Sequence, residues 1–143
     1  MFHLARQSQP RVIRLDTNVL VRYLAQDDAA QSARATRLIE HELSARNPGL
    51  VSLVVLCELL WVLASAYAVP ERDLVSIAER LLGAKELQLE APQLVRRALA
   101  VKTPSSAGLA DILIGLSHQA QGAAETASFD KRAGKLPGWR VLE

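Results

Sequence analysis

Short apolar, β-branched runs alternate with longer helical segments along the whole of this 143-residue chain. Parallel strands need long crossover connections, usually helices, whereas antiparallel hairpins need only short turns. The alternation therefore predicts an α/β fold of three layers, with a central parallel sheet of about five strands flanked by helices. In sheets of this kind the ligand site lies beyond the carboxyl ends of the strands.

The apolar periodicity and the Gly/Pro punctuation place eleven elements along the chain. We expect five strands, over Val12–Leu15, Leu50–Leu53, Leu87–Leu89, Glu125–Ser128 and Arg140–Leu142. We expect six helices, over Asn18–Gln26, Ala29–Ala45, Val54–Ala68, a segment opened by Pro70, Pro92–Val101 and Leu109–Gln121. The sequence contains no internal repeat or Gly/Ser linker, so residues 1–143 are expected to form one domain, with residues 1–10 as a flexible extension.

The segment Leu50–Val69 is long enough to span a bilayer and carries a single ionisable group. That group, Glu58, lies near its middle, and Pro48-Gly49 with the β-branched start favour a strand followed by a helix. We therefore expect a core segment and no membrane partner.

Composition further limits the kinds of core and binding site that this chain can have. Hydrophobic residues make up 50% of the chain but aromatic residues only 4%, which predicts an aliphatic core and argues against a binder that stacks bases on rows of rings. Trp61 and Trp139 have apolar neighbours and are expected to pack. A single cysteine, Cys57, allows neither an internal disulfide nor a cysteine zinc site, and the first ten residues lack a signal-peptide stretch, so a cytoplasmic location is expected.

Four acidic residues occupy unusual positions. Asp16 ends the first expected strand and Asp130 follows the fourth, whereas Glu58 and Asp111 lie in the apolar segments VVLCELLWVL and GLADILIGL. Burying an unpaired carboxylate is costly. Asp16 can be a helix cap, Asp111 can favour a helix amino terminus, and Asp130 can close a turn. Glu58 has no such explanation, because its helix offers no obvious solvated face, and we expect it to be buried.

Two strand ends and two helices of one parallel fold can bring these acids together. An oxygen-only ligand set suits Mg²⁺ or Mn²⁺. Two such ions can activate a water and stabilise the leaving oxygen of a phosphoryl displacement, which is nuclease chemistry. With the four acids set aside, eleven acidic residues remain against seventeen basic ones, and this excess of +6 suits a polyanionic substrate.

Four segments together resemble a PIN-domain ribonuclease, and most closely the VapC-type toxins of bacterial toxin–antitoxin pairs. They are LDTNVL from Leu15, the Glu58 helix, LADILI from Leu109, and Ser128-Phe129-Asp130. The resemblance extends from about Val12 to Leu142. It implies Mg²⁺- or Mn²⁺-dependent RNA cleavage that leaves 5′-phosphate and 3′-hydroxyl ends, a homodimer, and inhibition by a cognate antitoxin protein.

The same resemblance assigns roles residue by residue. The catalytic and metal-binding acids that it implies are Asp16, Glu58, Asp111 and Asp130, and Asn18 and Ser128 would support them. Apart from the resemblance, basic residues near the expected strand-end edge are candidates for phosphate contacts: Arg22, Lys131, Arg132 and Lys135. Many relatives have a further acid where this chain has Gly108. Whether the site binds one metal ion or two therefore remains open.

Two other functions remain as alternatives. A binding module of the same fold would contact RNA or protein without cleavage, and Gly108 leaves room for it. A small phosphatase would use Asp16 as nucleophile, but such enzymes have Asp-x-Asp where this chain has Asp16-Thr17-Asn18.

Overall fold

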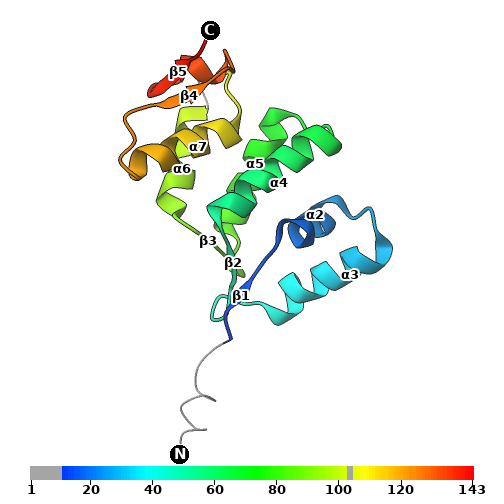
Figure 1. Ribbon diagram of the computed structural model, residues 1–143. Helices are drawn as coiled ribbons and strands as arrows, with labels where there is room; N and C mark the ends of the chain where they lie inside the picture. Colours follow the sequence, from blue (N-terminus) through cyan, green and yellow to red (C-terminus); the bar gives the residue numbers. More distant parts are fainter. Residues whose placement is uncertain (1–10, 103–104) are drawn as a thin grey trace, which may run out of the picture.

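A computed structural model describes residues 11–102 and 105–143 of the chain (Figure 1). The extension expected over residues 1–10 lies outside the described residues. The strands are β1 (Ile13–Arg14), β2 (Gly49–Val51), β3 (Leu87–Leu89), β4 (Thr126–Ser128) and β5 (Trp139–Val141). The α-helices are α2 (Thr17–Ala25), α3 (Ala29–Arg37), α4 (Leu53–Ala66), α5 (Glu71–Gly83), α6 (Pro92–Lys102) and α7 (Leu109–Ala120). A π-helical turn over Leu38–Glu42 continues α3, and a 3₁₀ turn over Ala133–Lys135 joins β4 to β5.

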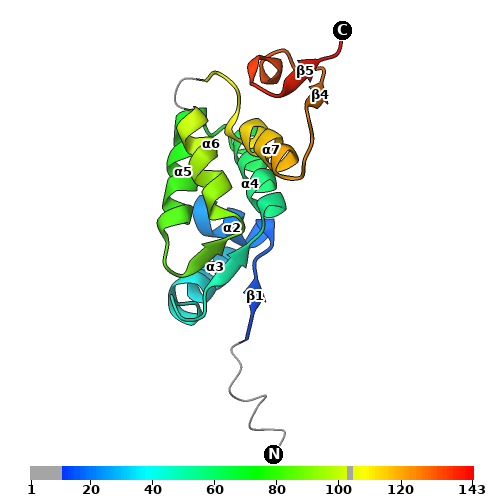
Figure 2. The same cartoon turned by 90° about the vertical axis from the view of Figure 1, so that its left-hand side faces the viewer.

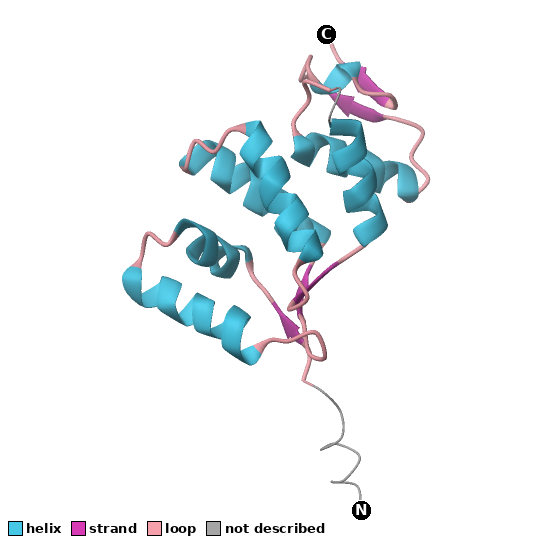
Figure 3. Ribbon diagram, turned by 180° about the vertical axis from the view of Figure 1, so that it is seen from behind, coloured by secondary structure: helices cyan, strands magenta, loops and turns pink. Residues whose placement is uncertain are grey.

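All five strands pair in parallel, which confirms the α/β class, but they do not form one sheet. The first sheet has the order β1-β2-β3, and β4 pairs only with β5. Two rotated views place the β4–β5 pair at the opposite end of the molecule from β1 (Figures 2 and 3). The expected sheet of about five strands is therefore too large, because β4 and β5 lie against α7 and not beside β1.

Contacts with α7 account for this arrangement. The indole of Trp139 lies against Gly115, where a side chain on the helix would collide with it. The ring nitrogen Nδ1 of His118 is hydrogen-bonded to the Thr126 hydroxyl at 2.8 Å, which ties α7 to β4. The packing role expected for Trp139 is confirmed.

Strand alternation shows which face of the three-stranded sheet holds the core. In β3, Leu87 and Leu89 are buried while Gln88 between them is exposed, as the two-residue period of a strand requires. The core that the helices complete is aliphatic, as the composition predicts; its most deeply buried side chains include Leu20, Ile39, Leu56, Leu59, Leu60, Leu109, Leu113, Val51 and Val95.

The long apolar segment divides as expected, into β2 and the 14-residue helix α4. Within residues 11–102 and 105–143, no helix is long and apolar enough to cross a membrane.

The orientation of α4 differs from expectation. Its inner face packs Leu56, Leu59, Leu60 and Leu63 into the core. Its outer face is exposed, with Val54 at 78% and Trp61 at 66%, and Glu58 lies between them. The predictions that Glu58 is buried and that Trp61 packs inside are therefore wrong, because an apolar helix can still turn one side to solvent.

Candidate active site

Asp16 lies where β1 gives way to α2. Its backbone is extended (φ −84°, ψ 159°), and its Oδ1 accepts a hydrogen bond of 2.8 Å from the amide of Thr17, so it serves as the helix N-cap. The side chain is exposed. Capping occupies Oδ1, and Oδ2 has no hydrogen-bond partner among the described residues. Asp16 is thus both a structural cap and a carboxylate open to a ligand.

Glu58 reaches toward Asp16 from α4, and Thr17 holds it there. The Thr17 side chain is only 6% exposed, and its hydroxyl donates a hydrogen bond to Oε1 of Glu58. This bond joins the first residue of α2 to the middle of α4, two helices that pack against each other. Thr17 is the one polar side chain among the buried residues of α2, and sequence pattern alone did not indicate its role.

Asp16 and Glu58 line the same open cavity, of about 470 Å³. We call it the acid groove. Its lining consists of Asp16, Thr17, Asn18, Val21, Arg22, Glu58, Val62, Ala66 and Tyr67. Four of the residues selected from the sequence meet there: Asp16, Asn18, Arg22 and Glu58. The groove therefore combines two carboxylates, an amide and a guanidinium from helices α2 and α4.

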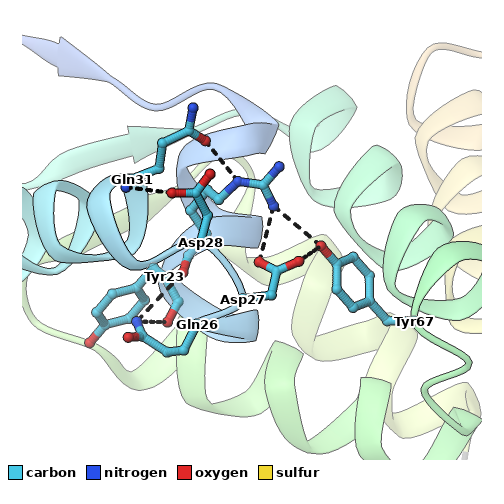
Figure 4. Close-up of polar contacts among 7 residues, drawn as sticks. Tyr23, Gln26, Asp27, Asp28, Gln31 and Tyr67 are labelled. Carbon is cyan, nitrogen blue, oxygen red and sulfur yellow. Dashed lines mark hydrogen bonds and ion pairs between the residues drawn. The ribbon is translucent and has the colours of Figure 1, made fainter.

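Arg22 is held at the rim of the acid groove by three side chains (Figure 4). Its Nε donates to Gln31 at 2.8 Å, and its Nη1 donates to Asp27 and to the Tyr67 hydroxyl, each at 3.2 Å. Tyr67 in turn donates to Asp27 at 2.7 Å. The bond with Tyr67 raises the pKa of Arg22, and the bond from Tyr67 lowers the pKa of Asp27, because each stabilises the charged form.

Asp111 stands in the first turn of α7 and is partly buried. Burial raises its pKa, the negative charge of Asp130 adds to this rise, and Arg132 opposes it. Gly108 caps α7 without a side chain, and Glu71 of α5 accepts the hydrogen bond from the amide of Leu109 instead.

Glu71 also lies close to Gly108, the position where many relatives have a further acid. A Cβ atom on Gly108 would lie 3.8 Å from Oε1 of Glu71 and 3.5 Å from Oδ2 of Asp111. A carboxylate from α5 thus stands beside Asp111 even though position 108 has none. No local pattern indicates this contact, since Glu71 and Asp111 are far apart along the chain.

Asp130 is exposed after β4 and closes a local turn. Its Oδ1 accepts hydrogen bonds from the amides of Arg132 (2.9 Å) and Ala133 (3.4 Å), and its own amide donates to the Ser128 hydroxyl at 3.0 Å. Ser128 therefore positions Asp130 through the backbone. The three other basic candidates, Lys131, Arg132 and Lys135, are located on this same segment and do not line the acid groove.

The four acids thus form two pairs. Asp16 and Glu58 share the acid groove, and the charge of Asp130 contributes to the raised pKa of Asp111. Burial, followed by the charge of Asp111, raises the pKa of Cys57, so the charge of Asp111 acts on the residue next to Glu58. Among the residues that the structure describes, no three His, Cys, Asp or Glu side chains are close enough to hold a metal ion. A site of four carboxylates stays a prediction.

The acid groove nevertheless suits a hard divalent cation. Mg²⁺ keeps several of its waters and is commonly bound by one or two carboxylates together with phosphate oxygens of a substrate. Asp16 and Glu58 offer that number of oxygen ligands in an open cavity, with no histidine or thiolate in its lining. The donor set therefore fits Mg²⁺ or Mn²⁺ bound by these two side chains.

Comparison with known proteins agrees with this chemistry. The family model described as the PIN domain matches residues 13–138 and so spans β1 to the turn before β5. A search of curated proteins gives no match. The match covers most of the chain and includes all four acids, and the chain therefore belongs to the PIN domain family.

Proposed function

We propose that this protein is a metal-dependent endoribonuclease that hydrolyses RNA phosphodiester bonds with Mg²⁺ or Mn²⁺. PIN domains are generally nucleases that use divalent metal ions. The observation that carries the proposal is the acid groove, where Asp16 and Glu58 meet and Arg22 is held at the rim.

Each groove residue has a separate task in the proposed reaction. A divalent cation bound in the groove would supply charge stabilisation and a more acidic water. Asp16 and Glu58 would hold it, and Thr17 keeps Glu58 in place through its hydroxyl. Arg22 would attract the phosphate that the two carboxylates alone would repel. The expected products carry 5′-phosphate and 3′-hydroxyl ends.

Asp111 and Asp130 complete the proposed ligand set. Their support is electrostatic: burial and the charge of Asp130 raise the pKa of Asp111, and a bound cation would favour its charged form. Glu71, beside Asp111, adds a carboxylate that the family resemblance did not include. Ser128 orients Asp130, and Lys131, Arg132 and Lys135 on the same segment remain candidates for phosphate contacts.

The biological setting that we propose is a toxin–antitoxin pair in the cytoplasm, with the protein as a homodimer and a cognate antitoxin as its inhibitor. This part rests on the resemblance to VapC-type toxins. The exposed Val54 and Trp61 on either side of Glu58 support it, because an apolar surface at a site rim is typical of a protein interface.

A second candidate is an RNA- or protein-binding module of the same fold with weak or no cleavage. Among the described residues no three acidic side chains lie close enough to hold a metal ion, which favours this candidate, since a site for two ions needs several carboxylates together.

Cleavage of a cellular RNA pool by the purified full chain separates these functions. We expect discrete cuts with Mg²⁺ or Mn²⁺, none in EDTA, and none with Asp16→Asn. Asp28→Asn is the matched control, because Asp28 also caps a helix (α3) but does not line the acid groove. If the folded wild type binds RNA but never cuts it, or if Asp16→Asn cuts as well as Asp28→Asn, the nuclease proposal is wrong.

A further inference from the structure

A second hollow, of about 280 Å³, opens on the helix pair α2 and α3. We call it the Arg34 hollow, and its lining consists of Asn18, Val19, Arg22, Gln31, Arg34, Ala35 and Leu38. Asn18 and Arg22 also line the acid groove. Because the two cavities share these side chains, they adjoin each other across one turn of α2.

The two cavities differ in charge. The acid groove contains Asp16 and Glu58, whereas the Arg34 hollow has no acidic residue in its lining and two arginines. The Arg34 side chain is exposed and forms no ion pair or hydrogen bond with any residue in the described ranges. The Arg34 hollow is therefore a positively charged site that adjoins the acid groove, where a divalent cation is expected.

Arg22 keeps donors available for a ligand despite its three partners. A guanidinium carries five N–H donors. The contacts with Gln31, Asp27 and Tyr67 use Nε and Nη1 only, and the remaining amino group, Nη2, has no hydrogen-bond partner among the described residues. The fixed guanidinium presents this amino group without having to be ordered first, which favours recognition of phosphate.

The remaining lining suits the rest of a nucleotide. Val19, Ala35 and Leu38 provide apolar surface for a ribose or a base. Gln31 accepts from Arg22 through its carbonyl oxygen, so its amide NH₂ can donate to a base. The lining thus offers cationic, apolar and amide groups to one nucleotide of a single RNA strand.

We propose that the Arg34 hollow binds the nucleotide next to the one that is cut, with its phosphate between Arg22 and Arg34. This inference rests on the proposed function, because it takes single-stranded RNA as the ligand. Arg22 would then contact the backbone at the junction of the two cavities, and Asp27, Tyr67 and Gln31 act as its positioning residues.

The test compares Arg34→Ala with Arg37→Ala. Both arginines are exposed on α3 and each substitution removes one positive charge, but only Arg34 lines the hollow. The probe is a fluorescein-labelled pool of single-stranded RNA 12-mers, titrated in EDTA at several salt concentrations. We expect Arg34→Ala to weaken binding severalfold and to reduce the slope of log K against log salt by about 0.7, as the loss of one phosphate contact predicts. Arg37→Ala should leave the slope nearly unchanged.

Cleavage with Mn²⁺ keeps the two proposals distinguishable. For a wild type that cuts RNA, Arg34→Ala should raise KM with little change in kcat, and Arg34→Lys should restore part of the binding. Equal effects of Arg34→Ala and Arg37→Ala in that enzyme would overturn the role of the hollow alone. A wild type that binds RNA without cutting it would overturn the nuclease proposal, while the binding titration would still decide whether Arg34 contacts the strand.

Discussion

Replacing Gly115 with alanine tests how β4 and β5 are attached to the helical core. Gly115 is buried on α7, and a Cβ atom there would lie 3.0 Å from Cε2 of Trp139 and closer still to Nε1. Ordinary carbon contacts are about 3.5–4.0 Å. The indole, and β5 with it, must therefore move away from the helix.

The free energy of unfolding should fall. Overpacking of this kind costs about 1–3 kcal/mol, and the better helix propensity of alanine returns about 1 kcal/mol. Because a rigid ring blocks the position, we expect a net loss of about 1–2 kcal/mol, which corresponds to a fall in Tm of about 5 °C for a chain of this size.

Gly83→Ala is the matched control. Gly83 ends α5, and nothing lies within 4 Å of the position that a Cβ atom would take there, so the same substitution should stabilise the protein by about 0.5 kcal/mol. Calorimetry and urea unfolding of both variants measure the difference. If Gly115→Ala unfolds no earlier than Gly83→Ala, then Trp139 does not lie on Gly115 and the docking of β4–β5 on α7 is refuted.

Three further substitutions test individual contacts. Thr17→Val removes the donor to Glu58 while keeping the buried shape, and should lower the rate of single-turnover RNA cleavage roughly tenfold to a hundredfold. Circular dichroism should show that the variant is folded, and an unchanged rate would contradict the role of this bond. Tyr67→Phe removes the hydroxyl that lowers the pKa of Asp27, so the carboxyl resonance of Asp27 should titrate at higher pH by ¹³C NMR, and the stability lost as pH falls through that pKa should shrink. Asp111→Asn should stabilise the metal-free protein at neutral pH, because burial and a neighbouring carboxylate raise the pKa of Asp111 in the folded state. The ionised side chain therefore opposes folding once the pH rises through the unfolded-state pKa of Asp111. Urea unfolding against pH should show a decline in the free energy of unfolding of the wild type that the variant lacks.

Local pattern determined much of the fold. Within residues 11–102 and 105–143, the five strands and six α-helices lie where apolar runs, Pro70 and Asn47-Pro48-Gly49 place them, with ends that differ by a few residues. Such boundaries depend on nearby residues, which is why the sequence predicts them.

Strand pairing and helix orientation, which depend on contacts far apart in the sequence, could not be predicted in the same way. Strands of two or three residues carry little information about their partners, so the separation of β4–β5 from β1 could not be read from their sequences. In α4 the apolar residues surround the helix, so periodicity could not show that Glu58 faces outward.

The candidate site was predictable as a set of residues but not as an arrangement. Asp16 and Glu58 stood out because carboxylates are rare in apolar surroundings, and both line the acid groove. Tyr67 and Thr17 did not stand out, because their partners Arg22 and Glu58 are 45 and 41 residues away along the chain.

The central claim is that the acid groove binds a divalent cation through Asp16 and Glu58. A titration of the ¹⁵N-labelled full chain with Mn²⁺, followed by paramagnetic broadening of its amide resonances, tests this without relying on activity. We predict that the amides of Asp16, Thr17 and Glu58 broaden first, that Asp28 at the cap of α3 stays sharp at the same Mn²⁺ concentration, and that Asp16→Asn abolishes the early broadening. Early broadening elsewhere, with the groove amides still sharp, would contradict the account.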